Sequence, residues 1–244
     1  ERNVIAGIKR LSKFQLSNGG LSYWPSSSYV SNWGTNYAGH FLLEAKSKGY
    51  YVSAAMLDKW IDYQSEKAQT WRKLSSNRND LIQAYRLYTL ALAGKPEVGA
   101  MNRLREIPEL SNEAVWCLTS AYALIGQKAI ALEMLYGKTE PSESVNYREL
   151  SGSYGSYVRD KAILLNTYTD LDDASEAYLV AKEISENLSS GGWLSTQTKA
   201  YCLMSMSRFM ERFGKGNEIS ATYTLNSNST ETISSNQKIW NTVF

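Results

Sequence analysis

The chain has 244 residues, of which 43% are hydrophobic and 20% are charged, and its formal net charge is +2. A chain of this length can bury one sizeable core, and these fractions are ordinary for a globular protein. The small net charge and the lack of a Lys/Arg run argue against a nucleic-acid surface. No apolar stretch approaches the roughly 18–20 residues of a membrane span. The chain opens on Glu1-Arg2-Asn3 without a signal-peptide pattern, as expected of a fragment whose targeting information lies elsewhere.

From residue 1 to about residue 210, apolar residues recur at helical spacing between groups of Gly, Ser, Asn and Pro. The first apolar stripe begins at Val4, continues to Phe14 and ends at a turn over 17–20. A strong helix is capped by Asp80 and closed by Gly94-Lys95-Pro96, a standard helix stop. The polar stretch 138–155 is predicted to be a loop. Further helices are predicted over 37–48, after Ser53, and over 81–92, 96–105, 111–125, 129–135, 159–169, 174–188 and 196–213.

Two similar turns lie near opposite ends of this helical region. Gly19-Gly20-Leu21-Ser22-Tyr23-Trp24 and Gly191-Gly192-Trp193-Leu194-Ser195 each place two glycines and an aromatic residue between helices. They form a weak internal repeat rather than an array of fixed period. Helical hairpins with such turns predict an all-α ring of paired helices, and a superhelical solenoid or an irregular bundle remains an alternative.

The pattern changes after residue 216. Residues 220–225 and 230–233 alternate in polarity around Asn226-Ser227-Asn228, which predicts a β-hairpin, and residues 239–244 could supply a third strand. Because such a segment is too small to fold alone, we expect residues 1–216 to form the helical domain. Residues 217–244 are then the β-strand segment of an adjacent β-sandwich-type domain.

Several strings, in order and at plausible spacing, resemble the complement-like helical domain of bacterial α2-macroglobulins. They are Gly-Gly-Leu-Ser-Tyr-Trp-Pro (19–25), Asn-Tyr-Ala-Gly-His-Phe-Leu-Leu-Glu-Ala-Lys (36–46), Gln-Ala-Tyr-Arg-Leu-Tyr-Thr-Leu-Ala-Leu-Ala-Gly-Lys-Pro-Glu (83–97), Ala-Met-Asn-Arg-Leu-Arg-Glu (100–106), Ser-Ala-Tyr-Ala-Leu-Ile-Gly-Gln (120–127), Arg-Asp-Lys-Ala-Ile-Leu-Leu (159–165) and Trp-Leu-Ser-Thr-Gln-Thr-Lys-Ala-Tyr (193–201).

This resemblance implies an α/α toroid connected to a small β domain. It also implies an endopeptidase inhibitor located in the periplasm or at the cell surface. Such proteins present a bait segment, change conformation when a protease cuts it, and trap that protease. The implied partners are target proteases and neighbouring β domains of the same chain, without nucleic acid, and with a membrane only through an anchor outside this fragment. The resemblance implies no enzyme activity and no cofactor, catalytic residue or metal site.

In family members with a thioester, a Cys-Leu-Glu-Gln-like motif forms the bond that couples to the protease. This chain has no Cys-x-Glu-Gln motif: Cys117 is followed by Leu-Thr-Ser, and Cys202 by Leu-Met-Ser. Either the motif lies before residue 1, or the parent protein belongs to a branch without a thioester. Both cysteines sit in apolar helical runs and are expected to be free, with a disulfide between them as the alternative.

Two other features suggest catalysis. His40 is the only histidine and could assist acyl transfer, although its helix resembles a packing element. Asp170-Leu171-Asp172-Asp173 matches the acid motif of triterpene cyclases, which also use α/α barrels, but its position between two helices favours capping.

An α/α-toroid enzyme acting on carbohydrate or isoprenoid is the second hypothesis. With one histidine and no cysteine near it in sequence, a prenyltransferase zinc site has few ligands. A glycosidase would need two carboxylates in a central cleft. The carboxylates available in this chain are better interpreted as helix caps or solvated groups. Three or more inward-facing carboxylates in one open cavity would support an enzyme, and a ring centre filled with apolar side chains would argue against one. The available carboxylates are Glu44, Glu66, Asp80, Glu113 and Asp160.

Aromatic residues crowd one segment of the chain. Such a cluster can stack on sugar rings, plug one end of a helical ring, or form an interface with a neighbouring domain. The structural interpretations are favoured, and these residues are the best candidates for a contact surface. They are Tyr23, Trp24, Tyr29, Trp33 and Tyr37.

Overall fold

The computed structural model describes residues 1–74, 79–150, 152–214, 219–224 and 230–235. Nearly all of the regular secondary structure in its described part is helical, which confirms the all-α fold class. The helices are α1 (Arg2–Leu11), α2 (Asn32–Ser47), α3 (Ala54–Thr70), α4 (Asn79–Leu92), α5 (Val98–Arg105), α6 (Asn112–Leu124), α7 (Lys128–Leu135), α8 (Tyr157–Leu171), α9 (Ala174–Ser189) and α10 (Thr196–Phe213), and the strands are β1 (Ile219–Thr224) and β2 (Thr230–Ser235).

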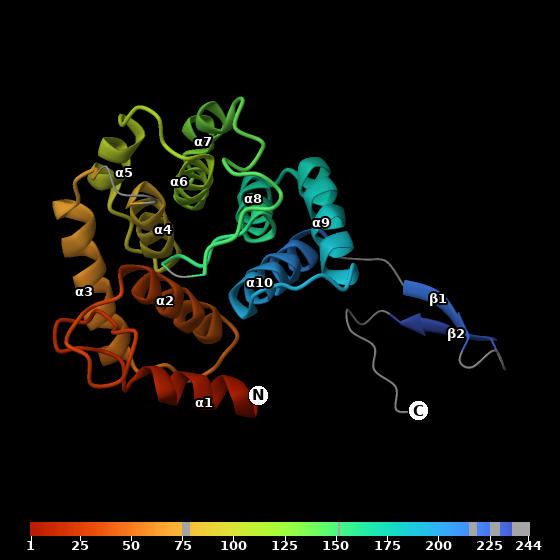
Figure 1. The fold of residues 1–244 in the computed structure, drawn as a ribbon, viewed down its shortest axis with the longest axis horizontal. Helices are drawn as coiled ribbons and strands as arrows, with labels where there is room; N and C mark the ends of the chain where they lie inside the picture. Colours follow the sequence, from red (N-terminus) through yellow and green to blue (C-terminus); the bar gives the residue numbers. More distant parts are fainter. Residues whose placement is uncertain (75–78, 151, 215–218, 225–229, 236–244) are drawn as a thin grey trace.

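The helices alternate between an inner and an outer layer (Figure 1). The even-numbered helices form the inner layer, in which α2 packs on α4, α4 on α6, α6 on α8, and α8 on α10. The odd-numbered helices lie outside: α3 packs against α2 and α4, α5 against α4 and α6, α7 against α6 and α8, and α9 against α8 and α10. This arrangement is an α/α toroid of helical hairpins.

The apolar pattern explains which helices lie inside. Inner helix α6 is buried along the whole run from Ala114 to Ala123, so it is covered on all sides. Outer helix α9 buries Ala177, Val180, Ala181 and Ile184, the single stripe expected of a surface helix. Because the stripes of α3, α5, α7 and α9 each cover two inner helices, one continuous core extends through most of the ring.

Serine begins most of the inner helices. Ser31, Ser111, Ser156 and Ser195 cap α2, α6, α8 and α10, and each side-chain oxygen accepts a hydrogen bond from the backbone N–H three residues on. Such a cap contributes about 0.5–2 kcal/mol relative to alanine. These caps fix where each inner helix starts at the end of the ring described below.

Two helix boundaries differ from the prediction by more than two residues. Helix α2 begins at Asn32 rather than at residue 37, because Ser31 caps it. Helix α1 ends at Leu11, and Gln15 beyond it pairs instead with Leu21 in an isolated bridge. In contrast, α10 has the predicted bounds.

The predicted β-hairpin is present. β1 and β2 pair antiparallel, with Ala221 opposite Ile233, and lie apart from the helices (Figure 1). The predicted turn over 226–228, the possible third strand over 239–244, and the proposed domain boundary between residues 216 and 217 lie outside the described residues.

Candidate functional site

The inner helices run in the same direction, so the ring has an amino end and a carboxyl end. At the amino end, the Ser111 N–H donates to Asp80 Oδ2 at 2.8 Å, and the hydroxyls of Ser156 and Thr198 are 2.8 Å apart. At the carboxyl end, Lys48 of α2 forms an ion pair with Glu211 of α10. The loops that enter α8 and α10 therefore meet at the amino end, and the loop that enters α2 reaches the α8 loop through Tyr23 and Tyr154.

Three of the aromatic residues predicted as a contact surface lie exposed in the loop that enters α2. The side chains of Tyr23, Trp24 and Tyr29 are 50%, 69% and 83% exposed. Tyr23 packs edge-on against Trp24 at 5.1 Å between ring centroids and stacks on Tyr154 at 6.4 Å. The hydroxyls of Tyr23 and Tyr154 are also hydrogen-bonded. We call Tyr23, Trp24 and Tyr29 the aromatic surface.

Trp33 and Tyr37 do not share this exposed surface. Trp33 is only 5% exposed, and its ring lies 5.1 Å from both the Tyr85 ring and the Arg159 guanidinium. Tyr37 stacks on the buried Tyr201 at 5.5 Å. Both residues are within α2, so helical geometry directs them toward the ring. Neither residue therefore lies on the exposed surface formed by the other three aromatic residues.

Trp193, which was not among the predicted contact residues, is also exposed at 61%. The guanidinium of Arg148 lies 4.9 Å from its ring centroid. The repeated Gly-Gly-aromatic turn was the signal that could have identified it. In both turns the first glycine has a positive φ, +93° at Gly19 and +71° at Gly191, a conformation that glycine adopts without strain.

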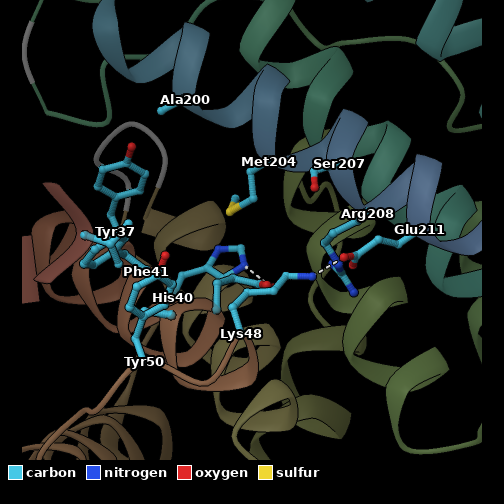
Figure 2. Close-up of a pocket in the computed structure, with 13 residues that line it drawn as sticks. Tyr37, His40, Phe41, Lys48, Tyr50, Ala200, Met204, Ser207, Arg208 and Glu211 are labelled. Atoms are coloured by element: carbon cyan, nitrogen blue, oxygen red, sulfur yellow. Dashed lines mark hydrogen bonds and ion pairs between the residues drawn. The ribbon is translucent and has the colours of Figure 1, made fainter. Parts of the chain in front are cut away.

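A pocket of about 310 Å³ lies between α2 and α10 (Figure 2). Tyr37, Phe41 and Met204 supply much of its apolar wall, and charged groups gather toward its Lys48 side. Such a mixture of apolar walls and a few convergent polar groups is typical of binding sites. The polar and charged lining residues are His40, Glu44, Lys48, Ser207, Arg208 and Glu211.

His40 is buried at the floor of this pocket, with 1% of its side chain exposed. Its Nδ1 lies 2.9 Å from the Tyr85 hydroxyl, and its Nε2 lies 3.6 Å from Glu44. Burial lowers the pKa of His40, and the interaction with His40 lowers the pKa of Glu44. This environment favours a neutral imidazole held in the core by a tyrosine.

The Asp170–Asp173 motif is divided among three structural roles. Asp170 is 4% exposed and accepts a hydrogen bond from Arg208 at 2.7 Å, while burial raises its pKa. Asp172 ends α8 in the left-handed region and pairs with Lys128 and Arg212, which lower its pKa. Only Asp173 is an N-cap, accepting from the backbone of α9. The capping interpretation is therefore wrong for Asp170, because the last turn of α8 directs that carboxylate toward α10.

The other candidate carboxylates do not share a cleft. Glu113 and Asp160 are fully buried rather than solvated; Glu113 accepts from the Ser142 N–H at 2.8 Å, and Asp160 pairs with Arg159 at 2.6 Å. Glu66 is exposed beside Lys67.

The ring centre is filled. The cavity that reaches its inner side chains, among them Tyr85, Tyr88, Tyr201 and Asn166, holds only about 10 Å³, room for no more than about one water molecule. This arrangement argues against a glycosidase or cyclase centre on the ring axis.

Both cysteines are buried and free. Burial raises the pKa of both thiols, that of Cys202 to about 12. Within the described ranges, no group of three or more His, Cys, Asp or Glu side chains is placed to hold a metal ion. None of the described helices combines the length and apolar character needed to span a membrane.

Comparison with known sequences gives clear relatives, although no protein-family model matches the chain. An alpha-2-macroglobulin of Escherichia coli K12 is 31% identical over 215 residues, which is 80% of this chain and 12% of the relative. One from Xylella fastidiosa Temecula1 is 29% identical over 208 residues, or 78% of this chain and 12% of the relative. The chain thus spans about an eighth of the length of these relatives.

Solved structures show the same fold. Native E. coli alpha-2-macroglobulin, spanning domain MG7 to the C-terminus, has a TM-score of 0.77 and 23% identity, covering 95% of this chain and 37% of that one. The E. coli protein activated by porcine elastase gives 0.72 and 20%, covering 95% and 21%. Salmonella alpha-2-macroglobulin reacted with methylamine gives 0.74 and 20%, covering 93% and 15%.

Proposed function

The chain belongs to the alpha-2-macroglobulin family, and we propose that it is the helical domain of a bacterial protein that traps proteases. The observation that carries this proposal is the 31% identity to the E. coli protein over 80% of the chain. Two solved structures of E. coli alpha-2-macroglobulin are described as activated, one by porcine elastase and the other by trypsin. The parent of this chain would likewise respond to a protease, outside the cytoplasm.

The helical domain would shelter or position a thioester encoded upstream. Residues 1–244 contain no Cys-x-Glu-Gln motif, and the cysteines are buried thiols with raised pKa values. Neither is therefore suited to form a reactive thioester. The Salmonella relative is described as reacted with methylamine, a small amine that opens thioesters. Residues outside this chain would form the thioester, and it would lie at or near the amino end of the ring.

The aromatic surface would pack on neighbouring β domains of the same polypeptide. Tyr and Trp suit interfaces because each buries a large apolar area while keeping one polar atom. Tyr23 is already oriented by its contacts with Trp24 and Tyr154, so little side-chain entropy would be lost on packing. The filled ring centre supports a structural role without catalysis, cofactor or metal.

Treatment of the parent protein with methylamine and with trypsin tests this function. We expect one free thiol per chain to appear with methylamine. We also expect trypsin bound by the parent to keep its activity on a small chromogenic peptide while losing activity on a large protein. If trypsin cleaves the large protein at an unchanged rate, the protein does not trap proteases. Loss of large-substrate cleavage without a released thiol would mean trapping without a thioester.

The aromatic surface is tested separately in the parent. Trp24→Ala should increase the proteolytic sensitivity of the junctions between the helical domain and its neighbours. Tyr51→Ala is the control, because Tyr51 is 87% exposed and lies outside the aromatic surface. Equal cleavage of the two variants would show that the aromatic surface is not an interface.

A further inference from the structure

The small cavity at the centre of the ring takes its lining from every inner helix, α2, α4, α6, α8 and α10 (Figure 1). We call it the central cavity. Its volume of about 10 Å³ is close to the roughly 10–15 Å³ that one water molecule requires. Each lining side chain is at most 5% exposed, so the cavity is closed to bulk solvent. The lining residues are His40, Tyr85, Tyr88, Cys117, Ser120, Ile163, Asn166 and Tyr201.

Two polar groups on this wall need a hydrogen-bond partner. In the described part of the chain, neither Oδ1 of Asn166 on α8 nor the hydroxyl oxygen of Tyr201 on α10 has one. Leaving a buried polar atom unpaired costs free energy, and most buried polar atoms in proteins therefore have a partner. The Asn166 oxygen can only accept a hydrogen bond, whereas the Tyr201 hydroxyl can donate one. A ligand that satisfies both must itself donate and accept.

The Tyr85 hydroxyl on α4 offers a third contact. It lies 2.9 Å from Nδ1 of His40. Burial lowers the pKa of His40, so the imidazole is neutral, and its Nε2 faces Glu44 at 3.6 Å. A proton on Nε2, directed toward that carboxylate, leaves Nδ1 to accept the hydrogen bond from Tyr85. The Tyr85 oxygen then keeps lone pairs that can accept a further hydrogen bond.

The central cavity is polar but carries no net charge. None of the described residues that line it is Asp, Glu, Lys or Arg. Burial keeps His40 neutral and raises the pKa of the Cys117 thiol, so that this group is also neutral at pH 7. A buried ion would therefore lack a counter-charge, which is costly. A neutral molecule of the size of water, able both to donate and to accept hydrogen bonds, matches the wall.

We propose that one water molecule is bound in the central cavity and joins α4, α8 and α10. It accepts a hydrogen bond from the Tyr201 hydroxyl and donates hydrogen bonds to Asn166 Oδ1 and the Tyr85 hydroxyl oxygen. Three such bonds are typical of a buried water. Within the described residues α4 packs directly on neither α8 nor α10, so this water links parts of the inner layer that do not adjoin. The inference does not depend on protease trapping or on a thioester.

A crystal structure of residues 1–244 at about 1.8 Å resolution tests the site directly. We expect one electron-density peak about 2.5–3.2 Å from both Asn166 Oδ1 and the Tyr201 hydroxyl oxygen. A direct hydrogen bond between Asn166 and Tyr201, with no peak between them, would overturn the proposal. A peak only about 2.0–2.6 Å from several lining oxygens would identify a metal cation and would also overturn it.

Deuteron magnetic relaxation dispersion counts long-lived internal water molecules in solution. Asn166→Leu replaces the accepting oxygen by a methyl group of similar shape, and we expect this variant to hold one internal water fewer than the unchanged chain. Asn187→Leu is the matched control, because Asn187 lies on the outer helix α9 and does not line the cavity. Tyr201→Phe removes only the donating hydroxyl and provides a second variant. An unchanged count in both Asn166→Leu and Tyr201→Phe would contradict the proposed site.

Discussion

Arg208 on α10 and Asp170 on α8 form an ion pair in which Nη2 and Oδ1 are 2.7 Å apart. The same guanidinium donates a hydrogen bond from Nη1 to the Tyr88 hydroxyl on α4. One side chain therefore joins three inner helices beside the gap that separates α10 from α2. Because α2 and α10 lack direct backbone packing, this contact helps to hold α10 in place.

Arg208→Ala should destabilise residues 1–244 by about 3–5 kcal/mol, because it leaves the carboxylate of Asp170 buried without its partner. Arg212→Ala is the matched control on the same helix: its ion pair with Asp172 is largely exposed and should contribute no more than about 1 kcal/mol. Urea unfolding followed by circular dichroism measures both variants. Similar losses of unfolding free energy in the two variants would show that the buried ion pair contributes no more to stability than the exposed one.

Stability should depend on pH through His40. Burial lowers the pKa of His40 in the folded state, so the unfolded chain binds a proton more readily. The free energy of unfolding should therefore fall as the pH decreases from about 7 through the unfolded value of about 6.5, by at most about 1.4 kcal/mol per pH unit. The charged and titratable groups that face the imidazole of His40 are Glu44, Arg208, Tyr85 and Tyr88.

Because His40 is the only histidine, His40→Gln should remove most of this dependence between pH 7 and pH 5.5. The glutamine amide can still form a hydrogen bond with the Tyr85 hydroxyl, which limits any further loss of stability in the variant. Chemical denaturation at several pH values provides the comparison. An unchanged slope in the variant would assign the pH dependence to carboxylates instead.

Gly39→Ala should be strongly destabilising, although alanine favours helices. A Cβ atom at Gly39 would lie 2.1 Å from Cε2 of the buried Trp60, so the ring or the helix must move. Overpacking of this kind costs about 1–3 kcal/mol, and sometimes more. Gly99→Ala in α5 is the control, since its nearest contact is the flexible Arg103 side chain at 3.7 Å. It should be neutral or stabilising by up to about 1 kcal/mol, as thermal unfolding would show.

The two native thiols should be unreactive in the folded protein. Burial raises their pKa values. A thiol reacts as its thiolate and only where the reagent can reach it, and a buried thiol with a raised pKa meets neither condition. Ellman's reagent should detect no thiol at neutral pH and both thiols after unfolding in urea. Rapid reaction of one cysteine before unfolding would contradict the buried placement of Cys117 or Cys202.

Local features of the sequence determined the helices with few errors. The apolar period, the serine caps and the glycine stops identify nearly all of the helices, and 196–213 was predicted with the observed bounds of α10. The error at α2 arose because the aromatic residues 33 and 37 looked like members of a surface cluster, whereas Ser31 begins the helix before them. A serine cap is a local signal. Whether Ser31 caps a helix or lies within a loop depends, however, on whether Trp33 can be buried in the core.

Which charged residues are buried was decided only by the tertiary structure. Asp170 and Asp173 lie three residues apart, yet one pairs with Arg208 on the neighbouring inner helix α10 and the other caps α9. Sequence spacing could not distinguish them, because the partner of Asp170 is 38 residues away in the chain. The gap between α2 and α10 is likewise invisible in the sequence. It depends on how the inner helices pack against one another, which is a property of the whole ring and not of any one helix.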